Sequence, residues 1–103
     1  MKFGEVIEAM RENPSRRFTR MGWNGKNMFI YLTPGHKVLA SDWTGPKECI
    51  QHKDVMQDDG VTITEHYAMI NGHVDMRTAD GSVIVGWLAT QTDMLKEDWI
   101  EVY

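Results

Sequence analysis

Apolar residues near the start of the chain are spaced like one face of a helix. They fall at positions i, i+3, i+4 and i+7, with charged residues on the other faces, which predicts an amphipathic helix. The helix is predicted to end at residues 13–15, Asn-Pro-Ser, because proline cannot continue a helix and disfavours helical geometry just before itself. The apolar positions are Phe3, Val6, Ile7 and Met10.

Two further patterns predict a hairpin. Residues 17–20 alternate between polar and apolar side chains like a short strand. Residues 28–32 form the apolar run Met-Phe-Ile-Tyr-Leu, which is typical of a strand largely buried on both faces. Because only the connection over residues 22–27 separates them, we expect these strands to pair.

A second hairpin is predicted in the C-terminal third of the chain. Residues 73–78 and 83–87 read as its strands, and the four residues between them contain an Asp-Gly pair, which is a strong short-range hairpin signal.

Residues 33–60 show no regular spacing of apolar positions. Two prolines, several glycines and mixed charges predict a long irregular excursion there, followed by a strand at residues 61–64.

The end of the chain predicts a short helix and a final strand. Thr90 or Thr92 is a candidate cap for a helix around residues 93–96, and residues 99–103 alternate like a strand. One N-terminal helix, one short C-terminal helix and about five strands indicate an α+β fold built on a small antiparallel sheet. With 103 residues, the chain is expected to form a single domain with one modest core.

Charge is distributed unevenly along the chain. Residues 1–37 carry seven basic and three acidic side chains, whereas the rest carries four basic and twelve acidic ones, for a net charge of −4. A net-acidic chain lacks the broad basic face that duplex DNA requires, so we expect no DNA or RNA binding. A local cluster could still hold a small anion, or its members could be solvated surface residues. The cluster consists of Arg16, Arg17, Arg20 and Lys26.

Cysteine usage and hydropathy favour a cytoplasmic protein. Cys49 is the single cysteine, which excludes an internal disulfide and fits a reducing compartment. The apolar runs are much shorter than a bilayer span, and the first residues carry acids where a signal peptide would be apolar. We therefore expect no membrane association.

No catalytic constellation emerges from the sequence. The four histidines are scattered and belong to no metal-binding or nucleophile motif. His73 and Asp75 could supply two metal ligands from one strand, but a third ligand of matching spacing is not evident. Asp75 and Asp80 could form an acid–base couple, although turn chemistry alone accounts for Asp80. We therefore expect no enzyme, no cofactor and no metal site.

The chain is rich in tryptophan and methionine for its length, with four and eight residues. Trp23, Trp87 and Trp99 each lie at the start or end of a predicted element. An indole ring can stack on a nucleobase, which contributes about 1–3 kcal/mol per base in single-strand binders. Amide, hydroxyl and acidic side chains nearby supply donors and acceptors for a base edge or a ribose. These rings indicate a planar, polar ligand; the competing interpretation is that they fill the core.

Three sequence blocks resemble the small phage proteins called Thoeris anti-defence two. The blocks are "FGEVIEAM", "RMGWNGKNMFIYL" and "HVDMRTADGSVIVGWLATQTDMLKEDW", in order from Phe3 to Trp99. Residues 35–67 lie outside the resemblance and are interpreted as a member-specific insertion in the single domain of residues 1–103. The resemblance implies a homotetramer that sequesters, without cleaving, the cyclic ADP-ribose isomers made by TIR-domain defence enzymes. It implies that cyclic dinucleotides are a possible second ligand class.

The resemblance also implies a pocket between protomers, located in the cytoplasm of the infected bacterium. Trp23 is expected to stack on the ligand, with Asn24 and Lys26 reaching the ribose or phosphate. The alternative function is a protein-interaction module that inhibits a host defence protein through the acidic C-terminal part, and a third is a metal-dependent nucleotide hydrolase using His73 and Asp75. The predicted ligand-binding residues are Trp23, Asn24, Lys26, Met28, Asp75, Thr78, Trp87, Thr90, Gln91 and Asp93.

Overall fold

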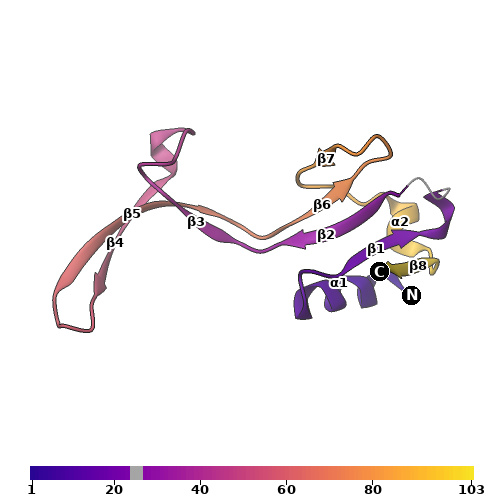
Figure 1. Cartoon of the computed structure of the whole chain (residues 1–103), viewed down its shortest axis with the longest axis horizontal. Helices are drawn as coiled ribbons and strands as arrows, with labels where there is room; N and C mark the ends of the chain where they lie inside the picture. The colour runs from indigo at the N-terminus through magenta and orange to yellow at the C-terminus, as the bar shows by residue number, and fades with distance from the viewer. Residues whose placement is uncertain (24–26) are drawn as a thin grey trace. The chain divides into compact units, whose positions relative to one another are not determined.

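The structure, a computed structural model, describes residues 1–23 and 27–103 (Figure 1). The chain divides into two compact units, the first formed by residues 1–34 and 72–103 and the second by residues 35–71. The first unit contains α1 (Phe3–Glu12), β1 (Arg17–Arg20), the 3-10 turn η1 (Met21–Trp23), β2 (Phe29–Thr33), β6 (His73–Arg77), β7 (Val83–Ile84), α2 (Gln91–Leu95) and β8 (Trp99–Val102). The second unit contains β3 (His36–Leu39), the 3-10 turn η2 (Lys47–Cys49), β4 (Ile50–Met56) and β5 (Thr62–Ile70). The predicted α+β class is confirmed.

The predicted N-terminal helix is confirmed as α1. Its start is held by the Glu5 side chain, which accepts a hydrogen bond from the backbone N–H of Lys2 at 2.9 Å. It ends where Asn13 and Pro14 were predicted to stop it, and the N–H of Asn13 donates to the carbonyl of Ala9 at 3.0 Å. In the part of the chain that the structure describes, neither α-helix is long and apolar enough to cross a membrane.

The first unit is built on a five-stranded antiparallel sheet with the order β7-β6-β2-β1-β8. Both predicted hairpins are confirmed: Phe18 of β1 lies opposite Ile30 of β2, and β6 pairs with β7. The final strand, β8, pairs with β1 along its length, so that Thr19 lies opposite Ile100. The sheet therefore brings the two ends of the chain together.

One face of this sheet carries the core. Side chains alternate between faces along each strand, so Phe18, Ile30 and Met76 point to the same side. The helix α1 packs on that side. The buried cluster consists of Val6, Ala9, Met10, Phe18, Ile30, Met76 and Trp99. The opposite face is lined by Arg17, Thr19, Phe29 and Arg77 among others, and these residues are described below as the open face.

Two strand predictions are corrected by the structure. The strand predicted as largely buried on both faces has only Ile30 fully buried, because α1 covers one side of the sheet and leaves Phe29 and Tyr31 half-buried on the other. The strand predicted over residues 83–87 ends at Ile84. Gly86 adopts a left-handed backbone with a φ of 72°, which a strand does not accommodate.

The short C-terminal helix α2 is confirmed, with Thr90 as its cap. The Thr90 hydroxyl accepts a hydrogen bond from the N–H of Asp93 at 3.1 Å, and the Asp93 carboxylate accepts one from the N–H of Thr90 at 2.9 Å. This reciprocal pair is a capping box. The carbonyl of Asp93 also accepts a hydrogen bond from the indole N–H of Trp99 at 2.9 Å, which ties α2 to the core.

The predicted irregular excursion at residues 33–60 is wrong. The second unit is an ordered three-stranded antiparallel sheet with the order β3-β5-β4, and the strand expected at residues 61–64 extends to Ile70 as β5. Tyr67 and Ala68 are its only buried residues, so most positions on both faces stay in contact with water. A sheet without a large apolar face lacks the alternation by which strands are recognised in a sequence.

Candidate functional site

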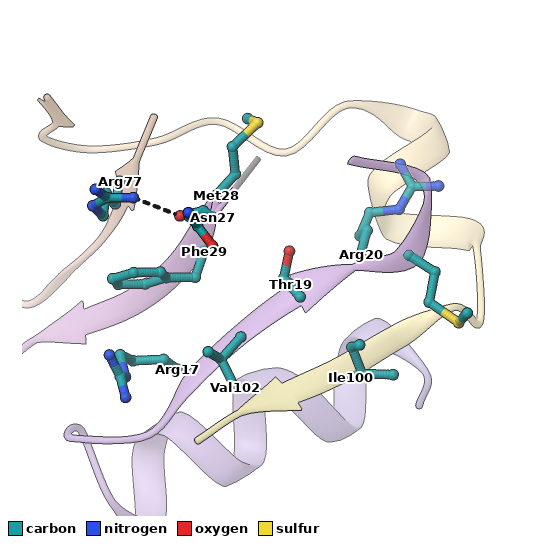
Figure 2. Close-up of a pocket in the computed structure, with 10 residues that line it drawn as sticks. Arg17, Thr19, Arg20, Asn27, Met28, Phe29, Arg77, Ile100 and Val102 are labelled. Carbon is teal, nitrogen blue, oxygen red and sulfur yellow. Dashed lines mark hydrogen bonds between the residues drawn. The ribbon is translucent and has the colours of Figure 1, made fainter. Parts of the chain in front are cut away.

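The open face of the first unit contains a groove with a volume of about 710 Å³ (Figure 2). The groove lies over β1, β2, β6 and β8, on the side of the sheet opposite the core. A smaller hollow of about 420 Å³ shares Arg17, Phe29 and Arg77 with it, so the two form one continuous surface. The described lining of the larger groove is Arg17, Thr19, Arg20, Met21, Asn27, Met28, Phe29, Arg77, Ile100 and Val102.

Strand register places an aromatic ring between two guanidinium groups at this surface. Phe29 of β2 lies opposite Arg77 of β6, and Arg17 projects from the neighbouring strand β1 on the same face. The Arg17 guanidinium carbon is 5.3 Å from the centre of the Phe29 ring. Figure 2 shows Arg17 and Arg77 on either side of that ring. Arginine stacks on aromatic faces and binds phosphate and carboxylate through its planar fork of donors.

Arg77 is positioned by the chain that enters β2. Its Nη1 donates a hydrogen bond to the carbonyl of Asn27 at 2.9 Å, which Figure 2 marks as a dashed line. Asn27 has a φ of 57°, a left-handed conformation that asparagine tolerates better than most residues. The lining therefore holds Arg77 beside Phe29 through a neutral carbonyl, and none of the ion pairs among the described residues involves Arg77.

The two other arginines of the predicted anion-binding cluster are neutralised. Arg20 forms ion pairs with Asp98 at 2.9 Å and with Asp93 at 2.7 Å. The hydrogen bond to Asp98, followed by the one to Asp93, raises the pKa of Arg20 above its usual value although burial opposes the shift. Arg16 forms a two-fold hydrogen bond with Glu101, at 2.6 and 2.9 Å. Of the described members of the cluster, Arg17 alone forms no ion pair within the described chain.

The predicted tryptophans gather at one end of the core. The rings of Trp23 and Trp87 are 6.1 Å apart and nearly perpendicular, and each also contacts the buried Trp99. Trp23 and Trp87 are half-buried and pack against the core cluster together with Phe3. The structure therefore brings Trp23 and Trp87 together and gives both rings a packing role, while their predicted contact with a ligand stays a prediction.

Asp75 is buried and lies within hydrogen-bonding distance of three groups. The hydroxyl of Thr33 donates to it at 2.5 Å, the N–H of Gly86 donates at 3.0 Å, and Nδ1 of His73 lies 2.7 Å away. Burial raises the pKa of Asp75, but the hydrogen bonds from Thr33, Gly86 and His73 outweigh it and lower the pKa overall. Asp75 thus anchors the segment after β7 to the sheet.

Thr78 and Asp80 stabilise the turn between β6 and β7. The Thr78 hydroxyl donates a hydrogen bond to the Asp80 carboxylate, and the Ser82 hydroxyl donates to the same carboxylate at 2.7 Å. These bonds lower the pKa of Asp80 to about 2. No three His, Cys, Asp or Glu side chains of the described residues gather closely enough to hold a metal ion, so His73 and Asp75 have no third partner there.

The remaining predicted residues are divided between α2 and the groove. Thr90 and Asp93 form the capping box of α2, and Asp93 is buried against Arg20. Gln91 is exposed at the start of the same helix. Met28 is the one described residue of the predicted set that lines the groove. Asn24 and Lys26 lie outside the residues that the structure describes.

Sequence reasoning did not find Phe29 and Arg77 as site residues. The sequence pattern places Phe29 in a strand largely buried on both faces, and Arg77 is 48 positions away in the sequence. Only the pairing of β2 with β6 brings them together. One signal was available in the sequence: Arg17 and Thr19 put polar side chains at every second position of β1. Once the strand register is known, these side chains identify the face of the sheet that also carries Phe29.

These features describe an α+β domain whose sheet is covered by a helix on one face and carries a basic, aromatic groove on the other. The chain matches the family model of the Thoeris anti-defense 2-like domain over residues 1–102. It is 34% identical over 100 residues to Thoeris anti-defense 2 of Bacillus phage SP01, a match that covers 96% of this chain and 91% of that protein. The chain therefore belongs to the Thoeris anti-defense 2-like family, which confirms the resemblance and supports a role in phage anti-defence.

The family match extends through residues 35–67, the segment that the sequence blocks left out. The structure places this segment in the second compact unit, which ends at residue 71. Its interpretation as an insertion specific to this chain, within a single functional domain, stays a prediction.

Proposed function

We propose that this protein is an anti-defence sponge that binds immune-signalling nucleotides and holds them without cleaving them. The proposed ligands are cyclic ADP-ribose isomers made by TIR-domain enzymes, with cyclic dinucleotides as a second class. Family membership supports the anti-defence role. The groove on the open face supports the choice of a nucleotide as ligand.

The single observation that carries the proposal is the arrangement of Arg17 and Arg77 around Phe29. A cyclic ADP-ribose isomer presents a diphosphate and a purine, which require cationic donors and a flat apolar face. The two guanidinium groups offer charge-assisted hydrogen bonds, and the ring with the neighbouring Ile100 and Val102 offers the apolar surface. A volume of about 710 Å³ falls within the range of about 300–1,000 Å³ that is usual for small-ligand sites.

The segment that carries Trp23, the predicted stacking residue, lies in the sequence between two residues that line the groove. Met21 and Asn27 both line the groove, and Trp23, Asn24 and Lys26 lie between them in the chain. We keep Trp23 as the proposed stacking platform, with Asn24 and Lys26 reaching ribose or phosphate; the described Trp23 ring packs against the core and does not itself line the groove. Asp75 and Asp93 would act by holding neighbouring segments in place rather than by meeting an anionic ligand. Thr78, Trp87, Thr90 and Gln91 stay predicted contacts.

A homotetramer would complete the site. The groove of one chain is a surface feature, so a second copy lying over it would enclose the ligand. Closed symmetric assemblies allow a chain of this size to surround a ligand it could not cover alone. The segment after β6 exposes an apolar stretch suited to such an interface: Val85 is 70% and Leu88 is 87% exposed.

Calorimetry with cyclic ADP-ribose isomers tests the proposal directly. Arg17→Gln and Arg77→Gln are each expected to weaken binding by about 10- to 100-fold, since a hydrogen bond to a charged group contributes roughly 1.5–3 kcal/mol. Arg11→Gln is the matched control, because Arg11 lies on α1 and, among the described residues, pairs only with the exposed Glu8. Ligand recovered after heat denaturation should have an unchanged mass.

The outcomes separate the candidate functions. A hydrolysed ligand would indicate an enzyme. No binding of any cyclic nucleotide, together with capture of one host defence protein, would favour the protein-interaction module. Unchanged affinity in both arginine variants would move the binding site away from the open face.

A further inference from the structure

The second unit carries a pair of histidines at opposite positions of a hairpin. The strands β4 and β5 run antiparallel, and their register places His52 directly opposite His66. The turn is closed by the N–H of Gln57, which donates to the carbonyl of Val61 at 2.7 Å. Because the two strands pair in register over seven residue pairs, the two imidazoles are held on the same face of the hairpin.

The two imidazole rings face each other through their Nδ1 atoms. Nδ1 of His52 lies 2.5 Å from Nδ1 of His66, with ring centroids 4.7 Å apart and planes inclined at 72°. Both side chains are exposed, so burial does not force this approach. Two imidazolium rings would repel one another at this distance. The arrangement suits either a shared proton or a cation that accepts a lone pair from each nitrogen.

We propose that His52 and His66 form a surface site for a divalent transition-metal ion such as Zn²⁺, bound through the two Nδ1 atoms. Imidazole is a preferred ligand of Zn²⁺, Cu²⁺ and Ni²⁺. Neither residue is part of the proposed nucleotide groove, which lies in the first unit, so this site stands independently of the proposed function.

A metal ion fits with small ring movements. Zinc–nitrogen bonds of about 2.0–2.1 Å at a tetrahedral angle place two ligand atoms roughly 3.3 Å apart, so the Nδ1 atoms need to separate by less than about 1 Å. Exposed side chains can make this change by rotation about χ1 and χ2 without moving the strands. Asp54, two residues beyond His52 on the same strand face, accepts a hydrogen bond from Thr64 at 2.7 Å. The protein thus supplies two ligands, and water or a small anion would complete the coordination.

Titration of the full-length protein with ZnCl₂ tests the proposal. The wild-type chain is expected to bind one Zn²⁺ per protomer. Loss of an outer-shell partner already weakens metal binding by about 10–100-fold, so removal of one of only two ligands in His52→Gln or His66→Gln is expected to cost at least as much. A second readout is the Cu²⁺ electron paramagnetic resonance spectrum, which should show coupling to two equivalent imidazole nitrogens and lose it in either variant.

Two control variants make the result specific. Cys49→Ser removes the exposed thiol that precedes β4, and His36→Gln removes another histidine of the same unit; both should bind Zn²⁺ like the wild-type chain. Circular dichroism should show that all four variants keep the fold. Equal binding by the wild-type chain and both His variants, binding abolished by Cys49→Ser, or absence of binding by the wild-type chain would each overturn the proposal.

Discussion

The indole ring of Trp23 meets the ring of Trp99 nearly at right angles, with their centroids 5.2 Å apart and an interplanar angle of 79°. Trp99 is fully buried, whereas Trp23 lies half-buried at the edge of the core. Edge-to-face aromatic pairs contribute about 0.5–1.5 kcal/mol beyond the burial of their area. Trp23 therefore supports the fold whether or not it contacts a ligand, and its two roles have to be measured separately.

We predict that Trp23→Ala lowers the free energy of unfolding by about 2 kcal/mol, less than the roughly 3–5 kcal/mol of a fully buried tryptophan, because the ring is half exposed. Urea unfolding followed by Trp fluorescence measures this change. Trp23→Phe keeps an aromatic contact to Trp99 and should lose less stability. If Trp23 is also the stacking platform, folded Trp23→Ala binds no cyclic ADP-ribose isomer at micromolar concentration. Full affinity per folded molecule would show that the ring serves the core alone.

Two phenylalanines on opposite faces of the same sheet provide a second prediction. Phe18 is completely buried under α1, whereas Phe29 is half-buried between Arg17 and Arg77. Phe18→Ala should cost about 3–5 kcal/mol of stability, and Phe29→Ala clearly less. Nucleotide affinity should respond in the opposite order, with a loss of about tenfold or more in Phe29→Ala, since one stacked base contributes about 1–3 kcal/mol.

Phe29→Tyr is the control, because it keeps the aromatic face. Thermal unfolding and calorimetry on the same preparations give both quantities. A Phe29→Ala protein that binds nucleotide like the wild-type chain would contradict the assignment of the open face, even if its stability behaves as expected.

The elements that the sequence predicted well are those in which local chemistry determines the structure. The apolar stripe beginning at Phe3, the Thr90 cap and the Asp-Gly turn before Val83 each depend on neighbours within a few residues. Apart from the strand predicted at residues 61–64, the second unit was missed because its strands expose most side chains on both faces. The groove was missed because Phe29 and Arg77 meet only through strand pairing, which no local pattern encodes.

A third prediction concerns acid stability. Burial raises the pKa of Asp93, but hydrogen bonds from Thr90 and Arg20 outweigh it and leave the pKa below its ordinary value of 3.8. The hydrogen bond from Arg20 also lowers the pKa of Asp98. A carboxylate whose pKa is lowered by folding contributes its stability fully above the unfolded pKa and loses it as the pH falls through the folded pKa. The ion pairs of Arg20 should therefore stabilise the fold above about pH 4 and be lost below it.

Thermal unfolding between pH 7 and pH 2.5 measures this effect. The wild-type melting temperature should stay level down to about pH 5 and then fall steeply. Asp93→Asn should melt lower at pH 7 and fall less on acidification, since the charge that would be protonated is already gone. Parallel curves for the two proteins would show that the Arg20–Asp93 pair contributes little to the acid transition.

The last prediction separates positioning from ligand contact at Asp75. Its carboxylate accepts from Thr33 and Gly86, so Asp75→Asn replaces one of two accepting oxygens with an amide group that only donates. Loss of a partner from a buried charged hydrogen-bond network costs about 1–3 kcal/mol. The segment from Val83 to Leu88 should then open more readily, and hydrogen exchange of the Gly86 and Trp87 amides should accelerate while that of β1 is unchanged.

Thr33→Val, which removes a different bond to the same carboxylate, should give a smaller change of the same kind. If nucleotide affinity falls in proportion to the exchange rates of the two variants, Asp75 acts by holding this segment; if it falls in Asp75→Asn without faster exchange, Asp75 contacts the ligand as the family resemblance implied.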